Sequence, residues 1–233
     1  MLYLFCFYSC YNINNRQGIE QVKLETPPLL RARNLQINQG KTEEYSISVG
    51  GNDAWKTCRY LGTLLDSDSD ILRQKQLAYG AMNKIKPIIE DRHLRLEIKV
   101  RAFNAYVTSV FPYNSETWTL TKAGTQTVDI FHRRLLKKTL NIRYPNIISN
   151  DELYRKTAEI PWGVRIESRR LRFLGHLLRL PEATPVRQAL NEFQLPHRRP
   201  VGAPKQTWLK IVNKNLKSRG VDNPRCPPAS PIP

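Results

Sequence analysis

The sequence lacks long apolar runs, because none reaches the roughly 18 residues that a membrane-spanning helix needs. Residues 1–11 (MLYLFCFYSCY) are apolar, but they have neither a basic leading segment nor a small-residue cleavage site, so we expect no signal peptide. Hydrophobic residues make up 40% of the chain and charged residues 24%, as in globular proteins. The composition therefore excludes a membrane protein, a collagen and a fully disordered chain.

Cysteines are few, and no histidine stands at zinc-binding spacing from any of them. The four cysteines, Cys6, Cys10, Cys58 and Cys226, are spread along the chain apart from one C-x3-C pair. We therefore expect free thiols, a reducing intracellular compartment and no metal site.

Acidic residues are scarce in the second half of the chain. The net charge is +17, from 37 Lys and Arg against 20 Asp and Glu, and residues 121–233 carry 22 basic and 8 acidic groups, a net +14. Such segregation indicates a protein that meets a polyanion, most simply nucleic acid, and a merely soluble basic surface is the alternative.

Hydrophobic periodicity predicts a mainly α fold. Residues 45–49 (YSISV), a turn at 50–53 and a returning strand at 55–65 form one expected β-hairpin. Pro27 and Pro28 are expected to break any helix before it. The expected helices are 70–86, 94–110, 124–141, 149–157, 163–180 and 205–219. Ten of the 16 prolines stand at or after Pro181, and residues 221–233 are expected to be disordered.

Two of these helices are expected to carry basic faces. In helix 124–141 the four cations Arg133, Arg134, Lys137 and Lys138 lie opposite the apolar side. In helix 163–180 five basic side chains form a column that spans roughly 21 Å and contains no acidic residue. We favour phosphate contact over a solvated face as the interpretation of this column. The column consists of Arg165, Arg169, Arg172, His176 and Arg179.

Several other polar and aromatic residues are expected to cap a helix or pack in the core. Asp66, Asp68 and Asp70 alternate and could chelate a cation, although such a run more often caps a helix. His132 lies toward the apolar side of its helix, so we interpret it as a core histidine. Trp118 could stack on a base, but burial is the interpretation we favour.

Five motifs in order resemble the reverse transcriptases of non-LTR (LINE-type) retrotransposons. They are residues 34–44 (NLQINQGKTEE), 59–63 (RYLGT), 115–121 (SETWTLT), 170–179 (RLRFLGHLLR) and the basic Pro/Gly stretch that precedes Trp208. The resemblance covers roughly residues 17 to 220. Gly202-Ala203-Pro204 departs from the Gly-Arg-Pro expected there.

The resemblance implies a division of the chain. Residues 1–16 are a divergent N-terminus, 17–66 a remnant of the palm with a hairpin like the primer grip, 67–145 a thumb-like helical bundle, 146–220 a basic helical C-terminal region and 221–233 a tail. Together with the basic faces, the resemblance implies that the protein contacts a nucleic acid, which is RNA, DNA or their hybrid. The expected contact residues are Lys41, Tyr60, Leu61, Gly62, Arg133, Arg134, Lys137, Lys138, Arg165, Arg169, Arg172, His176, Arg179, Arg198, Arg199 and Lys205.

The catalytic motif of that family is missing from this sequence, which contains no adjacent Asp-Asp pair. We therefore expect a primer- and template-binding part of an RNA-directed DNA polymerase that has no catalytic residues and is inactive alone. Magnesium is implied only for an intact polymerase, so no cofactor is expected here. Nuclear residence is implied by the family.

Two alternatives remain open from the sequence. The first is a stand-alone basic nucleic-acid-binding protein, whose binding would weaken steeply with salt. The second is a transposon relic with no selected role, against which soluble, monomeric and cooperative folding would argue.

Overall fold

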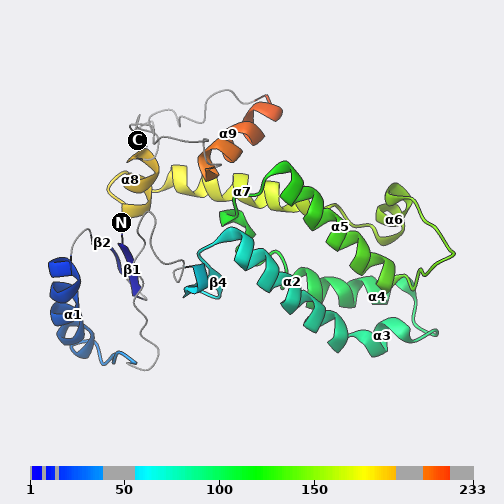
Figure 1. Ribbon diagram of the computed structural model, residues 1–233, viewed down its shortest axis with the longest axis horizontal. Coiled ribbons are helices and arrows are strands. Elements are labelled where there is room, and N and C mark those ends of the chain that lie inside the picture. The colour runs from blue at the N-terminus through cyan, green and yellow to red at the C-terminus, as the bar shows by residue number, and fades with distance from the viewer. Residues whose placement is uncertain (1, 7–8, 14–15, 39–55, 193–206, 221–233) are drawn as a thin grey trace, which may run out of the picture. The chain divides into compact units, whose positions relative to one another are not determined.

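The computed structural model describes residues 2–6, 9–13, 16–38, 56–192 and 207–220. The chain divides into two compact units, residues 1–70 and 71–233. The described residues are mostly helical, which confirms the mainly α expectation (Figure 1).

The first unit begins with a β-hairpin and a helix. Strands β1 (Leu2–Cys6) and β2 (Ser9–Ile13) pair antiparallel, with Leu2 opposite Ile13 and Cys6 opposite Ser9. Helix α1 (Arg16–Arg31) follows and contains Pro27 and Pro28, so the expectation that these prolines break a helix is wrong. Each proline leaves the carbonyl four residues earlier without an N–H donor. Those carbonyls belong to Lys23 and Leu24, which are exposed, so water can hydrate them.

The second hairpin of this unit is much tighter than expected. Strands β3 (Arg59–Tyr60) and β4 (Thr63–Leu64) pair antiparallel across a two-residue turn. The predicted single strand over 55–65 is therefore wrong, because the chain reverses direction within it. The other half of the expected hairpin, residues 45–53, lies outside the described residues.

Asp66 caps helix α2 (Ser67–Lys84) and thereby confirms the capping interpretation. Its carboxylate accepts hydrogen bonds from the backbone N–H of Ser69 at 2.9 Å and from the Ser69 hydroxyl at 2.7 Å. Asp70 is buried and accepts from the backbone N–H of Leu64 at 2.9 Å, which ties the β3–β4 hairpin to the start of the helix.

The second unit is an array of helices (Figure 1). Its elements after α2 are α3 (Lys86–Glu90), α4 (Leu96–Phe103), the π-helical η3 (Asn104–Thr108), the 3-10 turn η4 (Ser115–Thr117), α5 (Lys122–Thr139), α6 (Asn150–Thr157), α7 (Trp162–Arg179), α8 (Pro185–Glu192) and α9 (Trp208–Ser218). Each helix expected after residue 69 is present. Helix α8 was not expected, because its eight residues are too short a segment to show a helical period clearly.

The first core joins α2, α4, α5, α6 and the start of α7. At its centre Trp162 stacks on Phe111 and on His132, each at a centroid distance of 4.3 Å. The same cluster contains Ile71 and Ile166, so the expected thumb-like segment and the segment after residue 145 share one core.

Helix α7 extends from this core into a second one. Its later residues Leu174 and Leu177 are buried with Leu190 of α8 and Val212 of α9. The N-terminal end of α7 is held by α5, because the Asp129 carboxylate accepts from the backbone N–H of Gly163 at 2.8 Å. A Cβ at position 163 would lie 2.5 Å from the Thr125 methyl carbon, which explains the glycine.

Candidate nucleic-acid interface

Four of the expected contact residues, Lys41, Arg198, Arg199 and Lys205, lie outside the described residues. The remaining ones fall on three elements: the β3–β4 hairpin, α5 and α7.

The hairpin places Leu61 and Gly62 at its tip. Both have positive φ, 45° and 83°, as the two central residues of a type I′ turn require. The reason for glycine at 62 is therefore found in the turn itself. Leu61 is exposed, and Tyr60 is the last residue of β3.

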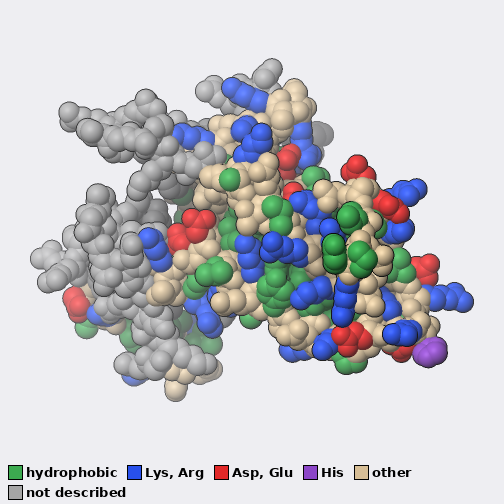
Figure 2. Space-filling view, turned by 45° about the vertical axis from the view of Figure 1, so that its right-hand side comes forward, with side chains coloured by type: hydrophobic (Ala, Val, Ile, Leu, Met, Phe, Trp, Pro, Cys, Tyr) green, Lys and Arg blue, Asp and Glu red, His purple; other side chains and the backbone are tan. Residues whose placement is uncertain are grey.

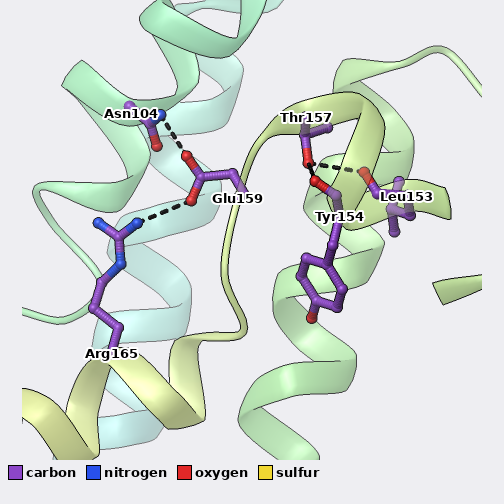
Figure 3. Close-up of polar contacts among 6 residues, drawn as sticks. All are labelled: Asn104, Leu153, Tyr154, Thr157, Glu159 and Arg165. Carbon is purple, nitrogen blue, oxygen red and sulfur yellow. Dashed lines mark hydrogen bonds and ion pairs between the residues drawn. The ribbon is translucent and has the colours of Figure 1, made fainter. Parts of the chain in front are cut away.

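The basic column of α7 divides into an engaged part and a free part. Arg165 forms an ion pair with the buried Glu159, Nη2 to Oε2, at 3.0 Å (Figure 3). Glu159 also accepts a hydrogen bond from the Asn104 side-chain amide at 2.5 Å (Figure 3). Arg169 donates to the backbone carbonyl of Pro112. These two arginines are held by the protein, and the sequence pattern missed their partners because both lie outside α7.

Arg172, His176 and Arg179 form the free part of the column. All three are exposed at positions i, i+4 and i+7 of α7, so they lie on one side of the helix. The Arg179 guanidinium lies over Gly175, where a Cβ would approach its Nη1 to 3.4 Å. Within the described ranges no carboxylate forms an ion pair with any of the three.

On α5 the four cations also differ in surroundings. Arg134 and Lys138 are exposed, whereas Arg133 and Lys137 are half-buried. The Lys138 ammonium lies 5.3 Å from the ring centroid of Tyr79 on α2, and the Lys75 ammonium lies 5.9 Å from that of Phe131. Figure 2 shows Lys and Arg side chains interspersed with hydrophobic ones over one face of the molecule.

Two motifs that are far apart in the sequence, residues 115–121 and 170–179, meet at α7, and Trp208 of α9 joins them. The indole Nε1 of Trp208 donates to the Glu116 carbonyl at 2.7 Å, and Arg170 Nη2 donates to the Trp118 carbonyl at 2.9 Å. Trp118 is 1% exposed, which confirms its interpretation as a core residue. The 115–121 motif thus lies beneath the arginine-rich helix and holds α7 and α9 in place.

Arg170 is the buried member of this junction. Burial lowers the pKa of its guanidinium from the ordinary value, and the nearby Glu167 opposes that shift. The Asn215 side-chain amide donates to the Ile211 carbonyl, and its oxygen accepts a hydrogen bond from Arg170 Nη1, each at 3.2 Å. Arg170 therefore acts as a structural link between α7, η4 and α9.

The sequence pattern missed a second basic stripe, on α9. Lys210, Lys214 and Lys217 are exposed at i, i+4 and i+7. Arg219 pairs with Glu167 of α7 at 3.1 Å, while Trp208 packs edge-on against Phe173. The periodicity of these lysines was visible in the sequence, but the packing of α9 beside α7 was not.

Among the described residues, no three His, Cys, Asp or Glu side chains cluster to hold a metal ion. In the same part of the chain, no helix is long and apolar enough to cross a bilayer.

The sequence is similar to a protein of transposon origin. It is 25% identical over 182 residues to the uncharacterized transposon-derived protein F52C9.6 of Caenorhabditis elegans. The match covers 74% of this chain and 64% of that protein, so the chain spans less than two thirds of its relative. No protein-family model and no solved structure matches the chain. The similarity indicates a transposon-related origin.

Proposed function

We propose that this chain is the primer- and template-binding part of a reverse transcriptase of the non-LTR retrotransposon type, and that its described basic helices bind the phosphate backbone. The observation that carries the proposal is the free column Arg172, His176 and Arg179 on α7. This helix is anchored in two cores, so its cations are presented from a rigid element. The similarity to a transposon-derived protein supports the same origin.

The spacing of the column supports contact with a nucleic-acid backbone. Arg172 and Arg179 are separated by seven residues, which is roughly 10 Å along the helix axis at 1.5 Å per residue. Uncompensated cations in a line repel one another, and a string of phosphates relieves that repulsion while accepting the hydrogen bonds of the guanidinium groups.

The test is the binding of a labelled RNA–DNA hybrid, compared with duplex DNA, at low and moderate salt. The double variant Arg172→Glu/Arg179→Glu should weaken binding about 100-fold, because it removes two phosphate contacts. Each lost contact should also lower the salt slope by about one. A matched control is Arg31→Glu/Arg33→Glu, which makes the same change in net charge in the first unit and should change affinity less than about threefold. Equal loss in both variants would show that only the total charge matters.

Nucleotidyl transfer is a separate part of the proposal. The sequence contains no adjacent Asp-Asp pair to hold catalytic metal ions, so the purified chain should incorporate no dNTP on a primed template with magnesium. Detectable incorporation would falsify this.

A stand-alone nucleic-acid-binding protein is the second candidate, favoured by the +14 charge of residues 121–233. Such a protein would bind hybrid and duplex DNA with similar affinity. Preference for the hybrid favours the reverse-transcriptase proposal, because the wide minor groove of an A-like helix is what distinguishes the two ligands.

A further inference from the structure

The connection between α5 and α6 holds two apolar side chains almost completely in solvent. Tyr144 is 93% exposed and Ile147 is 91% exposed, more than any other exposed large hydrophobic residue of the described chain. Singly exposed apolar residues are ordinary, but two on one short loop at this exposure are not.

The loop is fixed at both ends, so these side chains are presented by an ordered segment. Helix α5 ends in a left-handed residue, Asn141 (φ 52°), with the N–H of Ile142 donating to the Lys137 carbonyl at 2.9 Å. Ile142 packs against the first core, and Ile148 is buried in it. Between them the chain turns tightly, with the N–H of Asn146 donating to the Arg143 carbonyl at 2.9 Å.

One arginine lies on this loop, and a second shares a pocket with the start of the loop. Arg143 of the loop and Arg92, which follows α3, line one open pocket of about 280 Å³ together with Glu90 and Asn141. Glu90 pairs with Lys86 at 3.8 Å, and an Asp91 carboxylate oxygen accepts from the backbone N–H of His93 at 2.8 Å. Both arginines are exposed, and no carboxylate of the described residues forms an ion pair with them.

We propose that this tip, formed by residues 141–149 and Arg92, binds an unpaired nucleotide. The Tyr144 ring stacks on the base, Ile147 packs against its edge or the next base, and Arg92 and Arg143 contact the flanking phosphates. The proposal rests on the proposed nucleic-acid-binding function and adds a preference for a single strand or a junction of single strand and duplex.

Stacking requires an accessible base face, and in a continuous duplex both faces of every internal base are covered. Aromatic side chains flanked by cations are the usual platform for unstacked bases. A protein partner would match the apolar pair, but the two uncompensated arginines favour a polyanion.

The experiment compares a hairpin oligonucleotide carrying a five-nucleotide overhang with the same hairpin made blunt, at one salt concentration. A 2-aminopurine in the overhang reports stacking through fluorescence quenching. The wild-type chain should prefer the overhang about tenfold and quench the probe. Tyr144→Ser/Ile147→Ser should lose the preference and the quenching while keeping its affinity for the blunt hairpin.

Two controls separate the possible results. Tyr144→Phe keeps the ring and should keep the preference, and Tyr106→Ser removes another exposed tyrosine and should change nothing. Arg172→Glu/Arg179→Glu should weaken binding to both hairpins equally.

Retained preference in Tyr144→Ser/Ile147→Ser overturns the tip proposal but leaves the proposed function intact. Absence of binding to either hairpin by the wild-type chain overturns both. Self-association of the wild-type chain that the double serine variant abolishes, measured by sedimentation, also overturns the tip proposal, because a second copy then covers the loop.

Discussion

His132 is a buried, neutral histidine packed among aromatic rings. It stacks on Trp162 with ring planes 7° apart, and its ring centroid lies 6.1 Å from that of Phe103. The pKa of His132 is lowered from 6.5 to about 3, chiefly by burial and also by the positive charges of Arg165 and Arg133. The imidazole therefore contributes to the core as an aromatic side chain, which confirms the interpretation from the sequence that it is a core residue.

This shift makes the stability of the second unit depend on pH. The pKa of His132 in the folded state lies below that of the unfolded chain, so the unfolded state binds the extra proton between pH 3 and 6.5. Stability is full above about pH 6.5 and falls by up to about 1.4 kcal/mol per pH unit below it. Urea unfolding of wild type and of His132→Phe between pH 4 and 7 measures this. The variant should lose most of the pH dependence, while His93→Gln, at an exposed position, should retain it.

Ala158 occupies a backbone conformation that favours glycine. It has φ 51° at the end of α6, where the N–H of Glu159 donates to the Tyr154 carbonyl at 3.2 Å. Ala158→Gly should raise the free energy of unfolding by about 1 kcal/mol, because the left-handed region costs a Cβ-bearing residue that much.

The opposite result is expected at an ordinary helical position. Ala123 is exposed in the first turn of α5, and Ala123→Gly should lower stability by about 0.5–1 kcal/mol. Equal effects at the two positions, measured by thermal unfolding, would contradict the backbone argument.

At the scale of elements, α7 is the piece that connects two separate cores. Its first half packs with α5 and η4, and its second half packs with α8 and α9. Helix α9 is held by the Trp208 hydrogen bond at one end and by the Arg219–Glu167 pair at the other. An element attached to its own small cluster can open without unfolding the rest.

Trp208→Ala should therefore release α9 locally. Amide hydrogen exchange in α9 should accelerate about tenfold or more, since a packed tryptophan contributes at least 1.4 kcal/mol there. Exchange in α2 and α5 should be unchanged, because they belong to the first core. The exposed Lys214→Ala is the matched control. Faster exchange throughout both cores would indicate a single cooperative unit instead.

At the scale of the whole molecule, charge is the dominant property. Residues 121–233 carry a net charge of +14. Six basic residues of this segment, counting His176, form the two exposed stripes on α7 and α9. Charges of this kind act over about a Debye length, so their effect is governed by ionic strength.

Binding to nucleic acid should therefore fall steeply with salt. Three to five phosphate contacts predict a slope of log affinity against log salt of about −3 to −5, or a loss of about 10²–10³-fold between 50 and 200 mM. Filter binding or fluorescence anisotropy over that range measures it. A slope near zero would mean that the basic surface makes no phosphate contacts.

The sequence alone determined most of the helices and their buried faces. The faces of α5 and α7 follow from periodicity within one segment, as the burial of Val128, Leu135 and Ile166 confirms. The Asp66 cap is equally local. These features depend on residues within a few positions of one another, which is what a sequence pattern contains.

The tertiary structure decided which charged and apolar side chains are available for binding. Arg165 and Arg169 look like Arg172 and Arg179 in the sequence, but Glu159 and Pro112, brought from other elements, engage the first two. Tyr144 and Ile147 are exposed because the core takes up their neighbours Ile142 and Ile148 instead. Such outcomes depend on contacts between distant segments, and periodicity within one helix carries no information about them.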